Sequence, residues 1–284
     1  MQKYTKCKKL LIEVNQTCNI NCTYCFYRDY GRVKNFLNIE DIKKILEICP
    51  NADEFYLTGG ECFTSPNIKE IINFLSKRGN VVIFTNGTIL DSYTNEDMSK
   101  IVNNVNRFII SFDSFDFEKY ECRDKLDKTY NTLNKIIDID SNKLEVKVCI
   151  TNQNKNKLDE IFSQLIKIGV KKISVNFVFD IQNSNIKHEV KDIKDLNNIF
   201  KTIYKYIDYF NKRYIDMLFE MYINNYINEN YPCLADDKYL YYDCTGKLLI
   251  CPGNCKKLRY RGNWKDCFSK ECANEWEMMY DRGD

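Results

Sequence analysis

Hydrophobic and polar residues follow two alternating patterns along the first 180 residues. Short apolar runs rich in β-branched residues, typical of buried strands, alternate with segments whose apolar residues recur at helical spacing. Gly79 and the Asn86-Gly87 pair mark two of the boundaries. The predicted strands cover residues 9–15, 54–58, 81–85, 107–112, 143–150 and 172–179, and the predicted helices cover 39–49, 67–79, 92–104, 128–138 and 157–169.

This alternation predicts the fold class. Strands connected through helices run parallel, with right-handed crossovers, and helices then cover the sheet. We therefore expect an α/β fold: a partial (β/α)6 parallel TIM-like barrel with a small Cys-rich C-terminal module. Because parallel sheets bind ligands at the carboxyl ends of their strands, the loops that follow the strands are where functional residues are expected.

The character of the sequence changes twice after the last predicted strand. Residues 190–230 are rich in Tyr and have helical spacing, whereas residues 233–272 contain six cysteines among Pro and Gly. We expect a core domain over residues 1–189, a helical connector over 190–230 and a Cys-rich domain over 231–284.

Composition and charge exclude several classes of protein. The 284 residues include 42 Lys and Arg against 40 Asp and Glu, so a strongly basic nucleic-acid-binding face is not expected. No apolar run is long enough for a signal peptide or approaches the roughly 18 residues of a membrane span. We expect a cytoplasmic protein that binds neither nucleic acid nor membrane. In that reducing compartment, 14 cysteines point to metal or cluster ligation rather than to disulfides.

Three cysteines follow the first predicted strand after a short connection. Cys18, Cys22 and Cys25 are spaced CxxxCxxC, and thiolates are the preferred ligands of iron–sulfur clusters. Three thiolates on a four-iron cluster leave one iron open to an external ligand. From the spacing alone, a structural zinc site completed by a remote fourth cysteine is the alternative.

The CxxxCxxC spacing resembles the signature of the radical S-adenosylmethionine (SAM) superfamily, and further motifs match in order along the chain. An aromatic residue precedes the third cysteine, a Gly-Gly-Glu motif follows the second strand, and a Ser-x-Asp motif ends the fourth strand. The matching positions, which the resemblance assigns to SAM binding, are Tyr24, Gly59, Gly60, Glu61, Asn86, Ser111, Asp113 and Arg123.

The resemblance implies a cofactor set and a reaction. Cys18, Cys22 and Cys25 would hold a 4Fe-4S cluster whose open iron binds SAM. An electron from a donor such as flavodoxin or ferredoxin would cleave SAM to a 5'-deoxyadenosyl radical, which abstracts hydrogen from the substrate.

The matched residues also allow simpler interpretations. Gly59 and Gly60 are expected to let the backbone approach SAM closely, with Glu61 near its ammonium group; a tight turn with a surface Glu is the alternative. Arg123 can pair with the carboxylate of SAM or remain a solvated charge. Asp113 can instead cap the helix that follows.

The Cys-rich tail resembles another module of the same superfamily. Cys233-x12-Gly246-x4-Cys251 is similar to the opening of SPASM and twitch domains, which carry auxiliary 4Fe-4S clusters. A zinc-stabilised tail is the alternative. The expected ligands of one auxiliary cluster are Cys233, Cys251, Cys267 and Cys272, with Cys244 and Cys255 as alternatives.

Three functions remain open at this stage. The first is an enzyme that crosslinks, epimerises or oxidises a ribosomal peptide or a protein; the second is a small-molecule alcohol dehydrogenase of the twitch type; the third is a non-enzymatic, metal-stabilised binding module. Cys62 and Cys122 neighbour the expected SAM contacts and are candidates for hydrogen donation, with packing as the alternative. His188, the single histidine, is expected at the surface.

Overall fold

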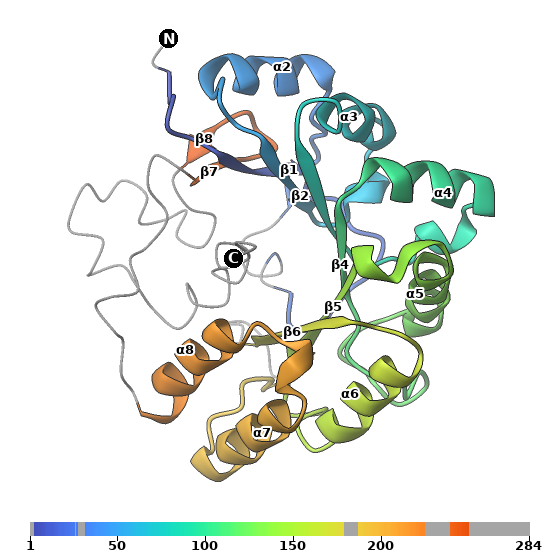
Figure 1. The fold of residues 1–284 in the computed structure, drawn as a ribbon, viewed down its shortest axis with the longest axis vertical. Coiled ribbons are helices and arrows are strands. Elements are labelled where there is room, and N and C mark those ends of the chain that lie inside the picture. Colours follow the sequence, from blue (N-terminus) through green and yellow to red (C-terminus); the bar gives the residue numbers. More distant parts are fainter. Residues whose placement is uncertain (1–2, 26, 28–31, 179–186, 225–238, 250–284) are drawn as a thin grey trace.

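The computed structural model describes residues 3–25, 27, 32–178, 187–224 and 239–249. Its strands form one sheet in the order β6-β5-β4-β3-β2-β1-β7-β8 (Figure 1). The strands are β1 (Lys9–Asn15), β2 (Glu54–Gly59), β3 (Asn80–Thr85), β4 (Arg107–Ser111), β5 (Leu144–Ile150), β6 (Lys172–Phe177), β7 (Tyr239–Tyr242) and β8 (Leu248–Leu249). The α-helices are α2 (Ile39–Ile48), α3 (Ile68–Leu75), α4 (Asn95–Asn104), α5 (Leu126–Asp140), α6 (Leu158–Lys167), α7 (Ile193–Lys205) and α8 (Lys212–Ile223).

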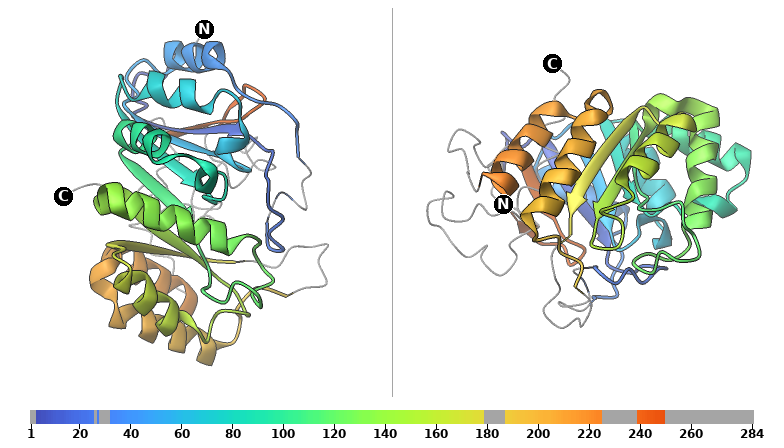
Figure 2. Two further views of the ribbon diagram at one scale, coloured as in Figure 1. Left: turned by 90° about the vertical axis from the view of Figure 1, so that its right-hand side faces the viewer. Right: turned by 90° about the horizontal axis from the view of Figure 1, so that it is seen from below.

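The predicted fold class is confirmed. The six predicted strands form β1 to β6, and each pair of neighbours among them is parallel. The sheet curves while the helices lie along its outer side, as in a partial TIM-like barrel (Figures 1 and 2). The described strands do not close into a full barrel, because β6 stands at one end of the sheet order and β8 at the other.

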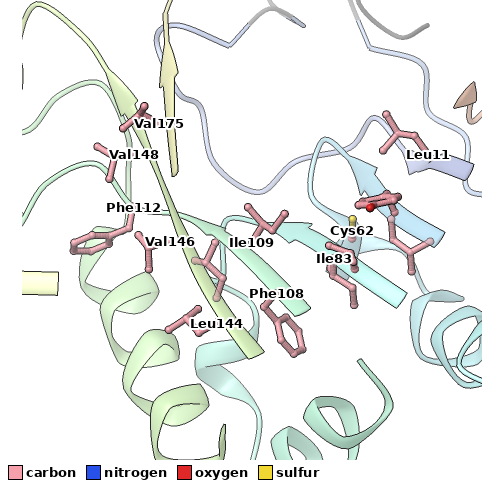
Figure 3. Packing of buried hydrophobic residues seen from close by; sticks show 14 of the residues in the cluster. Leu11, Cys62, Ile83, Phe108, Ile109, Phe112, Leu144, Val146, Val148 and Val175 are labelled. Carbon is pink, nitrogen blue, oxygen red and sulfur yellow. The ribbon is translucent and has the colours of Figure 1, made fainter. Parts of the chain in front are cut away.

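The apolar core lies between the outer face of the sheet and the helices. Successive strand residues point to opposite faces, and one alternate set, such as Leu144, Val146 and Val148 of β5, is wholly apolar and almost fully buried. Figure 3 shows these side chains with Phe108 and Phe112 of the neighbouring segment. This burial is the main force that holds the helices on the sheet.

The other alternate set carries charges at the amino ends of the strands. Glu145 of β5 is 2% exposed and lies 3.4 Å from Arg107 of β4 and 3.5 Å from Lys172 of β6. Ser174 of β6 donates a hydrogen bond to Glu145 Oε1 at 2.8 Å. We call Arg107, Glu145, Lys172 and Ser174 the base cluster. It connects three neighbouring strands at the end of the sheet away from the predicted site.

Two features lie beyond the six-unit pattern. The predicted helical segment after β6 contains α7 and α8, and Phe177 of β6 stacks on Phe200 of α7 and Tyr222 of α8. β7 was not predicted; it pairs in parallel with Lys9–Ile12 of β1 and forms an antiparallel hairpin with β8. Figure 1 shows this hairpin extending the sheet beyond β1.

The remaining predictions about the tail fall outside the described residues. This holds for the domain boundary at residue 230 and for five of the candidate ligands, Cys233, Cys251, Cys255, Cys267 and Cys272. Within the described part of the chain, the helices are too short or too polar to cross a membrane.

Candidate cofactor site

The three cysteines of the CxxxCxxC motif lie on one loop at the carboxyl end of β1. We call residues 16–25 the cluster loop. Cys18, Cys22 and Cys25 are free thiols of intermediate burial, and the Cys25 amide donates a hydrogen bond to the Cys22 carbonyl at 3.2 Å. The loop therefore brings the three thiols to one rim of the sheet while leaving each of them partly accessible.

The segment before α5 holds the cluster loop in place. The Thr23 amide donates to the Cys122 carbonyl at 3.0 Å, and the Asn21 amide donates to Asp124 Oδ2 at 3.1 Å. Lys125 Nζ donates to the Asn19 carbonyl at 2.8 Å. The cluster loop is thus fixed by hydrogen bonds to a segment about a hundred residues away in sequence.

Burial and neighbouring charges shift the pKa values of the cluster-loop thiols. Burial raises the pKa of Cys18, and it raises the pKa of Cys22 to about 12 although Arg123 acts in the opposite direction. Cys25 raises the pKa of both, as expected when neighbouring thiolates repel each other. Metal binding at such thiols releases protons.

The Gly-Gly-Glu motif packs directly against the cluster loop. A Cβ atom at Gly59 would lie 2.3 Å from the Asn15 carbonyl oxygen, and one at Gly60 would lie 2.5 Å from the carbonyl oxygens of Gln16 and Thr17. The Gly60 and Glu61 amides donate to the Asn15 and Thr17 carbonyls at 3.0 and 2.8 Å. In the structure, the backbone that approaches these glycines is that of the protein itself.

Glu61 is buried, so the interpretation of a surface Glu is wrong. Its carboxylate accepts hydrogen bonds from the Phe63 amide at 3.0 Å, the Thr85 hydroxyl at 2.7 Å and the Asn86 amide at 2.7 Å. Burial raises the pKa of Glu61 although these three donors lower it. The side chain therefore connects the loop after β2 to the end of β3.

Asn86 connects β3 to the cluster loop. Its Nδ2 group donates to Asn19 Oδ1 at 3.0 Å and lies 3.8 Å from Cys18 Sγ, while its Oδ1 accepts from the Thr88 amide at 2.9 Å. Arg32 Nη2 similarly lies 3.9 Å from Cys25 Sγ. N–H groups thus face two of the three sulfurs.

Tyr24, Asp113 and Arg123 form one hydrogen-bonded group, which we call the rim cluster; Asp113 and Arg123 are buried and Tyr24 is half-buried. Arg123 Nε donates to Asp113 Oδ2 at 2.8 Å, Arg123 Nη2 donates to the Tyr24 hydroxyl at 2.7 Å, and that hydroxyl donates to Asp113 Oδ2. Asp113 Oδ1 accepts from the Cys149 amide at 2.8 Å. Burial alone would lower the pKa of Arg123, but Asp113 raises it well above its usual value, so the guanidinium stays charged.

This geometry corrects two alternatives from the sequence. Arg123 is 7% exposed and is not a solvated charge. Asp113 does not cap the following helix, because α5 begins at Leu126 and Asp113 faces Arg123 instead. Ser111, the remaining matched residue, is half-buried at the end of β4 and lies opposite Lys147 in the register with β5.

The two candidate hydrogen donors, Cys62 and Cys122, have different surroundings. Cys62 is fully buried in the apolar core, where its thiol donates to the Phe84 carbonyl at 3.2 Å (Figure 3). Cys122 lies beside the cluster loop, and its Sγ is 3.0 Å from Gln153 Oε1 and 3.6 Å from His188 Nδ1. The prediction that His188 lies at the surface is wrong: it is 2% exposed and contacts the Tyr24 ring edge-on at 5.9 Å.

Sequence reasoning missed several residues that support the site. The Cys149 amide binds Asp113, Asn19 binds Asn86, and Glu13 of β1 binds the hydroxyl of Tyr27. The one signal for Glu13 was a charged residue within an apolar strand, because such a residue needs buried partners.

The residues present fit an iron–sulfur cluster. The loop offers three thiols with N–H groups beside two of them, and hydrogen bonds to the sulfurs are among the factors that tune such clusters. Within the described residues, no three His, Cys, Asp or Glu side chains converge as the ligands of a single metal ion would. Ligands of a four-iron cluster bind different irons and need not converge in that way.

The chain matches known proteins over this same region. The model of the Radical SAM superfamily matches residues 12–165. The antilisterial bacteriocin subtilosin biosynthesis protein AlbA of Bacillus subtilis is 25% identical over 189 residues, 63% of this chain and 42% of AlbA. A GTP 3',8-cyclase of Campylobacter jejuni is 27% identical over 203 residues, 66% of this chain and 61% of that protein.

A solved structure shares the fold. Streptococcus suis SuiB, bound to its precursor peptide SuiA, superposes with a TM-score of 0.69 at 16% identity, over 95% of this chain and 64% of SuiB. The chain spans less than two thirds of the length of each of these relatives. The family match covers more than half of the chain and includes the cluster loop and the strands that surround it. The chain belongs to the radical SAM superfamily.

Proposed function

We propose that Cys18, Cys22 and Cys25 hold the SAM-binding 4Fe-4S cluster of this radical SAM enzyme and that the enzyme modifies a peptide or protein. The observation that carries the first part is the cluster loop itself: three partly accessible thiols at the carboxyl end of β1, with N–H groups beside two of the sulfurs. Thiolates with such neighbours suit a cluster that must also accept an external ligand.

The residues around the loop fit a bound SAM molecule. Arg123 uses Nε and Nη2 for Asp113 and Tyr24, and within the described residues its Nη1 makes no hydrogen bond. We assign that group to the carboxylate of SAM, because a guanidinium pairs well with carboxylates. Ser111 and Asn86 would face the ribose, and the backbone at Gly59 and Gly60 would face the ammonium group.

Glu61, Asp113 and Tyr24 act as supports in this proposal. The Glu61 carboxylate already has three donors within the protein, and Asp113 and Tyr24 hold Arg123. When bound, the cluster and SAM supply a 5'-deoxyadenosyl radical that abstracts hydrogen from the substrate. The protein orients SAM and the substrate and excludes water from both.

The peptide substrate rests on two relatives. AlbA takes part in the biosynthesis of a bacteriocin, and SuiB has been solved with its precursor peptide SuiA. The GTP 3',8-cyclases favour a small-molecule substrate as the second candidate. Flavodoxin or ferredoxin is the proposed electron donor.

An auxiliary cluster in the tail completes the proposal. Cys233, Cys251, Cys267 and Cys272 remain the proposed ligands, within a domain over residues 231–284 that follows the core (1–189) and the connector (190–230). Cys244 suits this role less well, because it is fully buried in the hairpin turn, where its amide binds Glu13.

Anaerobic reconstitution tests the clusters. The wild type should bind about eight irons per chain and the Cys18/Cys22/Cys25 triple Ala variant about four. The wild type, given SAM and a strong reductant, should release 5'-deoxyadenosine; the triple variant should not. Cys49→Ala, which removes a buried thiol at the end of α2, is the matched control and should keep both properties. Release from the triple variant at the wild-type rate would contradict the proposal.

Substrate class is tested by separate incubations. The peptide product of any short open reading frame beside the gene, and a panel of nucleotides and sugars, would each be incubated with the reconstituted enzyme, SAM and a strong reductant. A mass or stereochemical change in the peptide, with increased 5'-deoxyadenosine release, is expected. Turnover of a panel compound with an unchanged peptide would favour the small-molecule alternative.

A further inference from the structure

A buried carboxylate at the end of β1 connects the cluster loop region to the C-terminal hairpin. Glu13 is 2% exposed. Its Oε1 accepts a hydrogen bond from the hydroxyl of Tyr27, two positions after Cys25. Its Oε2 accepts from Gln16 Nε2 at 3.0 Å and from the Cys244 amide at 3.2 Å. One side chain thus holds donors from both ends of the cluster loop and from a residue more than two hundred positions away.

The hairpin offers a firm partner for this contact. Its turn is closed by hydrogen bonds from the Thr245 and Lys247 amides to Asp243 Oδ1, at 2.8 and 2.9 Å. Cys244 is fully buried, and its carbonyl accepts a hydrogen bond from Asn35 Nδ2. Since β7 also pairs with β1 along Lys9–Ile12, the hairpin is attached to the core both by the strand and by the turn.

The two Glu13 partners at or next to the cluster loop, Gln16 and Tyr27, are also held in place. Gln16 begins the cluster loop, and while its Nε2 donates to Glu13, its Oε1 accepts from the Val33 amide at 2.8 Å. Tyr27 is 8% exposed. Both residues flank the thiols in sequence, so a shift at Glu13 reaches the cluster loop from either end.

A buried carboxylate cannot easily exchange these donors for others. Removing its charge leaves the remaining donors poorly satisfied, and the cost is larger for bonds to charged groups than for neutral ones. The hairpin cannot leave Glu13 without disturbing the loop, and the loop cannot shift without weakening the hairpin contact.

We infer that Glu13 is a positioning residue that makes the placement of the cluster loop depend on the seating of the hairpin. The two proposed tail ligands Cys233 and Cys251 flank this hairpin in sequence, so the hairpin is the described segment between them. The inference rests on the proposed function in one respect, namely that the loop thiols hold the cluster.

The first test changes residues at or next to the cluster loop and measures the accessibility of Cys244 in the hairpin. In iron-free protein, the alkylation rate of Cys244 is followed on the tryptic peptide 239–247, in which Cys244 is the single cysteine. Tyr27→Phe and Gln16→Ala change donors on the loop side, yet each should accelerate alkylation of Cys244, by up to about tenfold. In a Glu13→Gln background, neither should add a further increase.

The second test removes a contact of the hairpin and measures the spectrum of the cluster held by the loop. Asn35→Ala removes the contact to the Cys244 carbonyl and leaves the thiols of the loop unchanged. The electron paramagnetic resonance spectrum of the reduced SAM-binding cluster should shift in this variant and shift no further when Glu13→Gln is added. Glu54→Gln, a carboxylate on β2 that pairs with Lys9 at 2.8 Å, is the matched control and should change neither readout.

The outcomes separate this inference from the proposed function. Unchanged Cys244 protection in both Tyr27→Phe and Gln16→Ala overturns the inference, even where Glu13→Gln does not fold. Increases that persist in the Glu13→Gln background overturn it as well. A wild-type loop that binds no iron would contradict the proposed function, but the alkylation test, made without iron, would still decide the link through Glu13.

Discussion

The base cluster and the rim cluster are two arginine–carboxylate groups, each around a buried carboxylate, at opposite ends of the same sheet. In the base cluster, Glu145 faces Arg107 and Lys172 at 3.4 and 3.5 Å, and all members lie on strands. In the rim cluster, Asp113 faces Arg123 at 2.8 Å, and all three members lie on segments that follow strands. The same chemistry therefore holds strand to strand at one end and loop to sheet at the other.

A charge pair between strands and a charge pair between loops contribute differently to this fold. Strand residues are already fixed by the sheet, so a charge pair between them adds mainly to global stability. Loop residues have few such constraints, and Tyr24 and Arg123 derive their positions from Asp113. Damage to the base cluster should therefore unfold the protein, whereas damage to the rim cluster should release the loop first.

The largest effect is expected at the base. Glu145→Ala removes the carboxylate that Arg107 and Lys172 both face, and breaking such a buried group costs about 3–5 kcal/mol of unfolding free energy. Lys172 is partly exposed, so most of the loss should come from Arg107. Urea unfolding measures it. A loss below about 1 kcal/mol would remove the base cluster from the account of stability.

A smaller loss with a local signature is expected at the rim. Asp113→Asn keeps the shape of the side chain but removes the charge that faces Arg123, at a cost of about 2 kcal/mol. Hydrogen exchange should accelerate in residues 16–25 more than in the strands. Equal acceleration of hydrogen exchange in the loop and in the strands would show that the rim cluster, like the base cluster, contributes to global stability.

Tyr24→Phe separates the contribution of the Tyr24 hydroxyl from that of the ion pair between Asp113 and Arg123. It removes one hydroxyl that contacts both Asp113 and Arg123 and leaves that ion pair in place. The unfolding free energy should fall by about 1 kcal/mol, and exchange in the cluster loop should still accelerate. Tyr93→Phe, at a partly buried tyrosine on another loop, is the control and should leave the cluster loop unchanged. A cluster loop as protected as in the wild type would show that the Tyr24 hydroxyl does not hold it.

The smallest effect is expected in the pH dependence of the unfolding free energy, which should differ between Glu145 at the amino ends of the strands and Glu61 at the carboxyl ends. Burial raises the pKa of Glu145, but Arg107, Lys172 and Lys147 lower it below its ordinary 4.5, so its stabilisation is present above that value and is lost as pH falls through the folded pKa. Burial raises the pKa of Glu61 above 4.5, so its contribution has the opposite sign and is lost as pH rises through the folded pKa. Unfolding curves of Glu145→Gln and Glu61→Gln against pH should depart from the wild type in opposite directions. Departures in the same direction would contradict these assignments.

The sequence alone predicted the repeating part of the molecule. Apolar runs and helical spacing were enough for β1 to β6 and α2 to α6, because burial on a two-sided sheet imposes a local pattern on each element. The motif residues could be named from their spacing and from the resemblance they carry. That Cys18, Gly60, Asn86 and Ser111 come to one rim followed from the parallel strands alone, since each residue lies at or just after the carboxyl end of a strand.

The tertiary structure decided what each of these residues touches. Local sequence could not show that Glu61 and Arg123 are buried against protein partners, or that His188 packs on Tyr24. Nor could it show that Gly59 faces the end of β1 and Gly60 the cluster loop. It also could not show β7 beside β1, with Cys244 bound to Glu13. These contacts join residues tens to hundreds of positions apart. Burial of a polar side chain is satisfied by partners that only the folded chain brings within hydrogen-bonding distance.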